Sequence, residues 1–374
     1  MPADTDHLHF MKRALQLARR GVGRVSPNPL VGAVIVRDGR IVGEGYHLYE
    51  RKDHAEIVAL RQAGALARGA DLYLNLEPCS HVGRTPPCAG ALVGAGIRRV
   101  FVAVRDSNPL VSGRGITTLM QNGIEVQEGL CRDESARLNE KFFHFIQTGR
   151  PFALLKLALT LDGRIATAAG ESRWITDEPA RHVVHQLRYE YDAVLVGIGT
   201  VLRDDPSLDT RGTRRKALTK IIFDSNLRTP PQARVFSSPG TVVIFHDPGV
   251  PPDRVAALRE KALLLPVRRS ATGLDWNCAA KTLGEQKITS VMIEGGGQIA
   301  ASALASGVVQ KIAFFYAPKV LGSKGIPAIG ALDIPELACA IQLRDPRIRR
   351  LGQDWMLEGY PTAPPGPSEV RLPE

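Results

Sequence analysis

One stretch, residues 53–88, constrains this chain more than any other, because it brings one imidazole and two thiols close together in sequence. It contains His54-Ala55-Glu56 and Pro78-Cys79, and it ends with Pro87-Cys88. One histidine and two cysteines suit zinc, and three protein ligands leave a fourth coordination position open for water. The carboxylate of Glu56 can move protons to and from that water, which predicts a catalytic role for this residue. We therefore predict a zinc site made by His54, Cys79 and Cys88.

The predicted secondary structure places these residues where the chemistry needs them. Asp53 is predicted to cap a helix that begins at His54. A predicted strand, residues 71–76, ends just before Cys79. Cys88 follows two prolines and opens another predicted helix. The positive end of a helix favours a thiolate, which is the form of cysteine that zinc binds.

Two other interpretations of the same residues stay open. In one, His81 is a fourth protein ligand, so the zinc is closed to water and only structural. In the other, Cys79 and Cys88 form a disulfide. Glu56 and the strand–helix context favour the catalytic site, and an odd total of five cysteines does not suggest a disulfide framework. The cysteine usage and a polar N-terminus without the apolar core of a secretory signal predict a cytoplasmic protein.

The length of 374 residues is too great for one typical core, and the pattern predicts two α/β domains. The first is predicted to span residues 1–149 as a three-layer unit, and the second residues 150–360. Residues 361–374 are rich in proline and are predicted to be a disordered tail.

Individual elements follow from turn and cap signals. Asp38-Gly39 between two apolar segments predicts a hairpin with a type I′ turn. One helix is predicted over residues 133–148, and another over residues 177–191 with Thr176 as its cap. Apolar segments predict strands at residues 99–104, 125–127, 152–159, 193–197, 220–224, 241–246, 290–294 and 311–316.

The formal net charge of +10 is compatible with nucleic acid or with small anionic substrates. The runs Arg214-Arg215-Lys216 and Arg347 to Arg350 are predicted to be solvated loop charges. No apolar run approaches the roughly 20 residues that cross a membrane. Aromatic residues make up only 6% of the chain, whereas proteins that follow single-stranded nucleic acid need aromatic stacking surfaces. We expect small anionic ligands rather than nucleic acid or a membrane.

Several motifs together resemble the deaminase half of the bifunctional riboflavin-biosynthesis deaminase/reductases. They are Pro27-Asn28-Pro29, His54-Ala55-Glu56 and the segment Glu77-Pro-Cys-Ser-His-Val-Gly-Arg-Thr-Pro-Pro-Cys88. Eight residues (80–87) separate the two cysteines, whereas the signature of nucleoside and tRNA deaminases has two. The resemblance implies that residues 1–149 adopt a cytidine-deaminase-like three-layer α/β/α fold.

By this resemblance the first reaction is the zinc-dependent hydrolytic deamination of 2,5-diamino-6-(5-phosphoribosylamino)pyrimidin-4(3H)-one, with Glu56 transferring the protons. The implied substrate-binding positions are Asn28, His47, His81, Arg84 and Asn108. Without the resemblance, Asn28 between prolines is typical of a turn and Arg84 of a loop charge. Ser107 stands where the family's Asp-Pro-Asn-Pro loop has a proline, although Asn108 is present.

The second half resembles the reductase half of the same enzymes. Gly295-Gly296-Gly297 before a helix can bring backbone N–H groups against a phosphate, but alone this signal is weak. The resemblance depends on the segments 156–164, 170–176, 199–208 and 293–296 taken together in order. It implies a dihydrofolate-reductase-like α/β fold for residues 150–360. No G-x-G-x-x-G follows an early strand, so a Rossmann domain is not supported.

The implied second reaction is transfer of a hydride from NADPH to the ribosyl group, which gives 5-amino-6-(5-phosphoribitylamino)uracil. NADPH rather than NADH is implied by the resemblance alone. The implied cofactor-binding residues are Ala158, Trp174, Thr200, Asp204, Ser225, Gly296, Gly297, Gln298, Ile299, Ala300, Ala301 and Ser302. The implied substrate-binding residues are Ser172, Arg188, Leu208, Arg211 and Glu294. Lys156 and Asp162 are further candidate members of the reductase site.

Three competing functions are set against this interpretation. The first is a deaminase whose reductase half is inactive, which saturable NADPH binding with hydride transfer would exclude. The second is a nucleic-acid deaminase that uses its positive charge to follow phosphates. The third is a zinc-stabilised binding module, which predicts four protein ligands and no water on the metal. The resemblance further implies a homo-oligomer, either a dimer or a tetramer.

Overall fold

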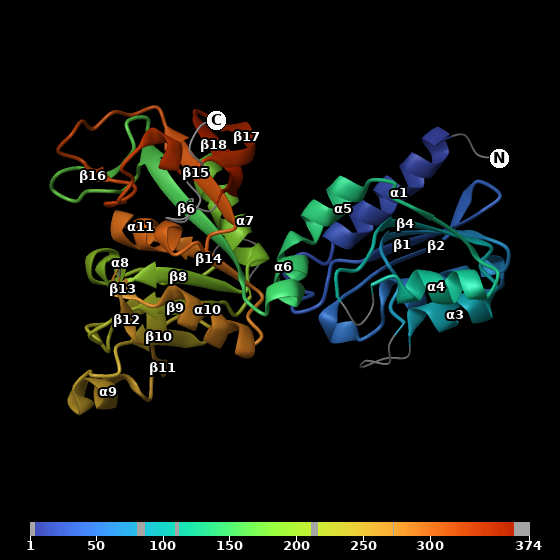
Figure 1. The fold of residues 1–374 in the computed structure, drawn as a ribbon, viewed down its shortest axis with the longest axis horizontal. Coiled ribbons are helices and arrows are strands. Elements are labelled where there is room, and N and C mark those ends of the chain that lie inside the picture. Colours follow the sequence, from blue (N-terminus) through green and yellow to red (C-terminus); the bar gives the residue numbers. More distant parts are fainter. Residues whose placement is uncertain (1–3, 81–86, 109–111, 211–215, 272, 363–374) are drawn as a thin grey trace, which may run out of the picture. The chain divides into compact units, whose positions relative to one another are not determined.

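The computed structural model describes residues 4–80, 87–108, 112–210, 216–271 and 273–362, and the chain divides into two compact units (Figure 1). Unit 1 is Met1–Gly149 and unit 2 is Arg150–Glu374. The boundary residue Gly149 has a φ of +66° and directly follows a helix, as glycine often does because it has no Cβ to clash there.

Unit 1 contains one five-stranded sheet with strand order β2-β1-β3-β4-β5. Strand β1 pairs antiparallel with both β2 and β3, whereas β3, β4 and β5 are parallel. The elements are α1 (Asp4–Arg19), β1 (Gly32–Arg37), β2 (Arg40–Tyr46), α2 (Ala55–Ala63), β3 (Asp71–Leu76), α3 (Cys88–Ala95), β4 (Arg99–Val104), α4 (Arg114–Gln121), β5 (Glu125–Glu128), α5 (Arg132–Leu138) and α6 (Glu140–Thr148).

Helices cover both faces of this sheet, as the alternation of side chains along β3 requires (Figure 1). Leu72 and Leu74 pack with the apolar sides of α2, α3 and α4. Tyr73 points to the other face, where it packs with Phe10 of α1 and stacks on Phe101 with ring centroids 4.6 Å apart. The unit is therefore a three-layer α/β/α domain whose central strand is buried throughout.

Unit 2 is built on a nine-stranded sheet with order β11-β10-β9-β8-β14-β6-β15-β18-β17, parallel except for the last two pairings. Its elements are β6 (Phe152–Thr160), β7 (Arg164–Ala166), α7 (Glu178–Glu190), β8 (Ala193–Gly197), α8 (Ile198–Asp204), β9 (Thr219–Phe223), β10 (Val242–His246), α9 (Pro252–Leu258), β11 (Leu263–Pro266), β12 (Arg269–Ser270), β13 (Gly273–Leu274), α10 (Trp276–Glu285), β14 (Ser290–Glu294), α11 (Gly297–Ala305), β15 (Lys311–Ala317), β16 (Ile326–Pro327), β17 (Leu343–Leu351) and β18 (Asp354–Pro361).

Two hydrophobic cores lie on the two faces of the large sheet. Leu155, Leu157 and Leu159 of β6 pack with α10 and α11 on one face. Phe152 and Leu154 pack with α7 and α9 on the other. Unit 2 is therefore a second layered α/β unit.

The predicted type I′ turn of unit 1 is present between β1 and β2. Its two central residues have positive φ angles, 50° at Asp38 and 74° at Gly39.

Three predicted helix details are wrong. Residues 133–148 form two helices, because Asn139 leaves helical geometry and uses its side chain to bind the backbone of Leu30. The N-cap of α2 is His54, not Asp53, whose carboxylate instead accepts a hydrogen bond from Arg61 at 3.1 Å. The N-cap of α7 is Asp177 rather than Thr176.

The C-terminal prediction also needs correction. Arg347 to Arg350 are not loop charges: they lie in β17, an edge strand with its arginines exposed. Pro361, predicted to begin a disordered tail, ends β18 and pairs with Leu343. Residues 363–374 of that tail lie outside the described part of the chain. Among the described residues, no helix is long and apolar enough to cross a membrane.

Candidate active sites

The predicted zinc ligands come from three elements that meet at one end of the unit 1 sheet. His54 precedes α2, Cys79 follows β3, and Cys88 is the first residue of α3. Helix α2 is seated tightly on β2, since a Cβ at Gly45 would lie only 2.0 Å from the Ala55 carbonyl oxygen. This close approach places the first turn of α2 beside the sheet.

The structure brings His54, Cys79 and Cys88 together. Their ligand atoms all lie within 4.8 Å of one another. His54 Nδ1 is 3.1 Å from Cys88 Sγ and 3.5 Å from Cys79 Sγ. Atoms bonded to one tetrahedral zinc at about 2.0–2.3 Å are separated by about 3.5–3.8 Å. The three residues therefore fit a zinc ion. Both cysteines are free thiols, so the disulfide alternative is wrong.

Ionisation within this cluster also suits a metal. The pKa of the Cys79 thiol falls to about 4, because Cys88 and then His54 hydrogen-bond to its sulfur. The pKa of the Cys88 thiol rises, because its S–H is held by the Cys79 sulfur and because it is buried. Of the two thiols, Cys79 is therefore the one whose ionisation is favoured, and Cys88 holds its proton more tightly. A zinc ion would replace the remaining proton, because zinc binds cysteine as thiolate.

Glu56 lies in the first turn of α2 and is 3% exposed. Burial, followed by the negative charge of Cys79, raises the pKa of its carboxyl group. Its Oε2 atom is buried and has no hydrogen-bond partner among the residues that the structure describes. A buried carboxylate oxygen without a partner is costly, and it is the atom that a water molecule on a neighbouring metal would satisfy.

Two predicted substrate-binding residues lie against this cluster. Asn28 Nδ2 is 2.9 Å from His47 Nε2, and His47 Nδ1 is 3.0 Å from the carbonyl oxygen of Asp53. A carbonyl only accepts, so the proton of His47 is on Nδ1 and Nε2 accepts from the Asn28 amide. The His47 ring lies edge-on to the His54 ring, with centroids 5.5 Å apart.

The other predicted substrate residues of unit 1 are less completely described. Asn108 lies in the loop after β4, where its backbone N–H donates to the carboxylate of Asp106 at 2.8 Å. His81 and Arg84 lie outside the described residues.

In unit 2 the structure joins three of the predicted reductase residues. The carboxylate of Glu294, at the end of β14, accepts hydrogen bonds from Arg188 Nε at 2.6 Å and Nη2 at 3.0 Å. Lys156 Nζ lies 3.8 Å from the same carboxylate. Burial opposes ionisation of Glu294, but the charges of Arg188 and Lys156 outweigh it and lower its pKa to about 2. Burial also lowers the pKa of Lys156.

The predicted cofactor residues are spread over several elements. Ala158 lies in β6, Thr200 and Asp204 in α8, and Ser225 just after β9. Trp174 is 59% exposed, with the Arg181 guanidinium 4.6 Å from its ring centroid. The segment from Gly296 to Ser302 is the start of helix α11, with Gly296 as its N-cap; it includes Gly297, Gln298, Ile299, Ala300 and Ala301.

Not all of these side chains are equally open to a ligand. Ala300, Ala301 and Ser302 are buried, and the Ser302 hydroxyl accepts a hydrogen bond from the Trp276 indole N–H at 3.0 Å. Ser172 is partly buried, and Leu208 is buried with a φ of 52°. Arg211 lies outside the described residues. Asp162 accepts from the Thr160 hydroxyl and from the backbone N–H groups of Leu321 and Gly322.

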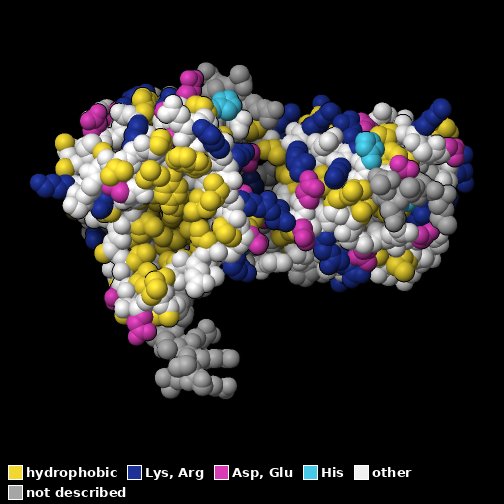
Figure 2. Space-filling model, turned by 90° about the horizontal axis from the view of Figure 1, so that it is seen from above, with side chains coloured by type: hydrophobic (Ala, Val, Ile, Leu, Met, Phe, Trp, Pro, Cys, Tyr) yellow, Lys and Arg dark blue, Asp and Glu magenta, His cyan; other side chains and the backbone are white. Residues whose placement is uncertain are grey.

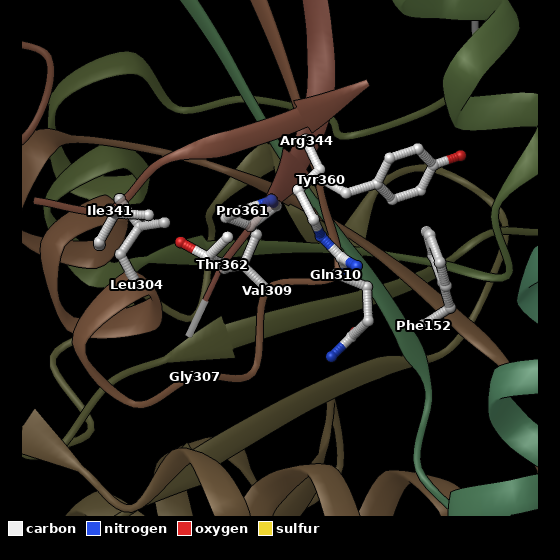
Figure 3. Close-up of a pocket in the computed structure, with 10 residues that line it drawn as sticks. All are labelled: Phe152, Leu304, Gly307, Val309, Gln310, Ile341, Arg344, Tyr360, Pro361 and Thr362. Carbon is white, nitrogen blue, oxygen red and sulfur yellow. The ribbon is translucent and has the colours of Figure 1, made fainter. Parts of the chain in front are cut away.

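One pocket in unit 2 is separate from all of these residues (Figure 3). Its volume is about 330 Å³, and its lining includes Phe152, Gln310 and Tyr360. Phe152 begins β6 and Gln310 precedes β15, so the pocket lies at the amino ends of these parallel strands. Glu294 lies at the carboxyl end of β14, and none of the predicted site residues that the structure describes lines the pocket.

Sequence reasoning does not identify the buried polar residues that support the unit 1 site. Glu77 and Asp106 are 4% and 8% exposed, and Asn75 and Asn139 are also buried. The one available signal is position, because Glu77 stands between a buried strand and Pro78-Cys79. The partners of these side chains are distant in sequence and become known only from the fold.

Comparisons with known proteins give a match in each unit. Residues 4–104 match the family described as the cytidine and deoxycytidylate deaminase zinc-binding region. Residues 151–357 match the RibD C-terminal domain. These matches confirm the predicted fold class, a cytidine-deaminase-like α/β domain followed by a reductase α/β domain.

Similar proteins cover nearly the whole chain. The riboflavin biosynthesis protein RibD of Aquifex aeolicus is 43% identical over 352 residues, which are 93% of this chain and 97% of that protein. A solved structure of Acinetobacter baumannii RibD has a TM-score of 0.86 at 37% identity, covering 96% of this chain and 99% of that chain. A Thermotoga maritima diaminohydroxyphosphoribosylaminopyrimidine deaminase/5-amino-6-(5-phosphoribosylamino)uracil reductase has a TM-score of 0.83 at 35% identity, with coverage of 96% and 99%.

Proposed function

The chain belongs to the family of the riboflavin biosynthesis protein RibD, and from this premise we propose how its two units divide the work. It is a bifunctional enzyme of riboflavin biosynthesis, a hydrolytic deaminase and a reductase, that uses zinc and NADPH. Its substrate is 2,5-diamino-6-(5-phosphoribosylamino)pyrimidin-4(3H)-one and its product is 5-amino-6-(5-phosphoribitylamino)uracil. Unit 1 carries the deaminase and unit 2 the reductase.

The deaminase chemistry is assigned to Glu56 beside the three zinc ligands. His54, Cys79 and Cys88 would hold the zinc ion, which would lower the pKa of a water molecule in its open position. Glu56 would take a proton from that water and give it to the ring nitrogen. It would then carry the remaining hydroxyl proton to the amino group, which leaves as ammonia while the ring carbonyl forms. Asn28, His47 and Asn108 hold the pyrimidine, as the family resemblance implies.

In the reductase unit, bound NADPH would supply a hydride to the ribosyl C1′. The bond from C1′ to the ring oxygen breaks and that oxygen takes a proton, which leaves an open ribityl chain. Arg188 has five N–H donors, of which three bind Glu294 and the Asp209 carbonyl. In the hydrogen bonds of the described residues the other two donors are not used, and they suit the substrate phosphate. Glu294 fixes the guanidinium in one orientation, and Lys156 adds a second positive charge beside it.

The single observation that carries the deaminase proposal is the buried, unpartnered Oε2 of Glu56 next to a His/Cys/Cys cluster. A purely structural zinc site needs no such carboxylate. With four protein ligands the zinc would bind no water, so the Glu56 carboxylate oxygen would stay without a hydrogen-bond partner.

One assay tests both halves in sequence. Zinc-loaded protein is given the diaminopyrimidinone ribosyl phosphate, first without NADPH and then with it. We expect ammonia release without NADPH, followed by NADPH oxidation when the cofactor is added. Ammonia without later NADPH oxidation would leave a deaminase with an inactive reductase unit. No ammonia from folded, metal-loaded protein would refute the deaminase.

We further propose that the protein is a cytoplasmic homo-oligomer, either a dimer or a tetramer. The five cysteines are all unpaired, which fits a reducing compartment. Hydrophobic side chains gather on one face of unit 2 (Figure 2). Unit 2 also has single exposed apolar side chains, among them Leu337 and Ile348, which are 90% and 74% exposed. Exposed apolar surface of this kind is typical of subunit interfaces. Sedimentation at several protein concentrations tests the oligomeric state.

A further inference from the structure

Glu77 has no role in the reaction steps above, yet its carboxylate is fully hydrogen-bonded inside unit 1. It directly follows β3 and is 4% exposed. Its carboxylate accepts four backbone N–H bonds, which is all that two oxygens accept comfortably at this geometry. Oε2 accepts from Asp106 at 3.2 Å and Gly113 at 3.0 Å. Oε1 accepts from Gly115 at 3.0 Å and Ile116 at 3.3 Å.

These four donors come from two separate parts of unit 1. Asp106 belongs to the loop after β4, and the other three belong to the start of α4. The first N–H groups of a helix have no intrahelical partner, and the N-cap of α4, Gly113, has no side chain to supply one. Glu77 therefore caps α4 from a different strand, with a negative charge that suits the helix N-terminus.

The same contact extends to the zinc ligands and to the substrate loop. A Cβ at Gly115 would lie 2.0 Å from the Pro78 carbonyl oxygen, so α4 packs directly on the residue before Cys79. On the other side, Asp106 is held by Glu77 through its N–H and accepts the Asn108 N–H with its own carboxylate. One side chain thus joins the segment that carries Cys79 to the loop that carries Asn108.

We propose that Glu77 is a positioning residue for the deaminase, which fixes the substrate loop at residues 106–108 relative to the metal site. It does not touch substrate or metal. This proposal rests on the deaminase function proposed above. Because Glu77 acts through Asn108, its loss weakens substrate binding while the metal and Glu56 stay in place.

The substitution Glu77→Gln tests this with almost no change in shape. In either orientation of the amide, its NH2 group faces two backbone N–H donors that it cannot accept from. We expect the KM for deamination to rise about tenfold, with kcat per bound zinc within about twofold of wild type. Hydrogen exchange should accelerate in the peptides that contain residues 106–108 and 113–116.

Matched controls separate positioning from general damage. Glu44→Gln removes another carboxylate of unit 1 and is the control. In the hydrogen bonds of the described residues, this carboxylate accepts only from the Arg13 side chain, so the KM for deamination should not change. Reduction of the already deaminated intermediate by NADPH reports on unit 2 in the same sample and should be unaffected. Zinc content should equal that of wild type.

An unchanged KM in Glu77→Gln would overturn the proposal, as would exchange rates that stay the same around residues 106–116. Loss of zinc with a collapse of kcat would also overturn it, since Glu77 would then support the metal site rather than the loop. If wild-type protein releases no ammonia, the deaminase function fails. The exchange measurement then still decides whether Glu77 holds the loop.

Discussion

Glu294 holds Arg188 by two hydrogen bonds of 2.6 and 3.0 Å, and both side chains are largely buried, 13% and 12% exposed. Lys156 lies 3.8 Å from the same carboxylate. The single negative charge of Glu294 therefore lies between two positively charged side chains inside unit 2. Removing one partner from a buried ion pair is costly, because the remaining charge stays in a medium of low polarity.

Glu294→Gln should lower the free energy of unfolding of unit 2 by about 3 kcal/mol at neutral pH. The three tryptophans, Trp174, Trp276 and Trp355, all lie in unit 2, so tryptophan fluorescence during denaturation reports on this unit alone. Asp247→Asn breaks an exposed pair with Arg269 and is the control, with little change expected. Equal midpoints for Glu294→Gln and wild type would contradict the prediction.

The pH dependence of this effect has a definite sign. The pKa of Glu294 is lowered from 4.5 to about 2 in the folded chain, so ionisation of this group stabilises the fold above the unfolded pKa. That contribution is lost as the pH falls from about 5 toward about 2. The difference in unfolding free energy between wild type and Glu294→Gln should therefore shrink between pH 6 and pH 3. A difference that is constant over this range would show that folding does not lower the pKa of Glu294.

Glu56→Gln should reduce deamination by about 10³-fold, because an amide cannot carry the proton from water to the leaving group. The zinc ligands are untouched, so zinc content measured by atomic emission should equal that of wild type. Reduction of the deaminated intermediate in unit 2 should continue at the wild-type rate. Deaminase activity within tenfold of wild type would mean that another group moves the proton.

Cys88→Ala should abolish zinc binding and deamination together, since two remaining ligands hold zinc poorly. Cys278→Ala, an exposed cysteine in α10 of unit 2, is the matched control and should change neither. NADPH oxidation with the deaminated intermediate should survive in both variants. Retention of one zinc per chain in Cys88→Ala would point to a ligand outside the described residues, such as His81.

The strand–helix setting of His54, Cys79 and Cys88, which the structure brings together, could be predicted because each signal is local in sequence. β3 is Asp71–Leu76 and α3 is Cys88–Ala95, as the turn residues and the apolar run predict. Asp38-Gly39 likewise predicts its own turn. Where the residues that determine a turn, a strand or a helix end are adjacent in sequence, the local sequence pattern is sufficient to predict it.

The predictions that were wrong depend on contacts between distant residues. The helical pattern over residues 133–148 runs through Asn139, and only the fold shows that this side chain is needed by Leu30. The arginines of β17 look like a solvated loop because they are exposed on both faces of an edge strand. The four partners of Glu77 lie 29 to 39 positions away in sequence. No local pattern carries this information.

The break between α5 and α6 gives a further prediction, since Asn139 clamps the backbone just after the predicted substrate residue Asn28. Its Oδ1 accepts the Leu30 N–H at 2.8 Å, and its Nδ2 donates to the Leu30 carbonyl at 3.0 Å. Asn75 also donates to that carbonyl at 2.9 Å. Asn139→Leu therefore leaves the carbonyl with a partner but removes the acceptor of a buried N–H, which costs about 2 kcal/mol.

We expect Asn139→Leu to lower the midpoint temperature of thermal unfolding of unit 1. Circular dichroism measures this transition, and the tryptophan fluorescence of unit 2 is the internal reference. The KM for deamination should rise, because the loop that carries Asn28 loses one of its two anchors, whereas zinc content should not change. Asn122→Ala is the control, since its side chain makes one exposed hydrogen bond, to the Thr118 carbonyl. If both variants behave alike, the clamp at Leu30 contributes nothing specific, and Asn75 alone is sufficient to hold the loop.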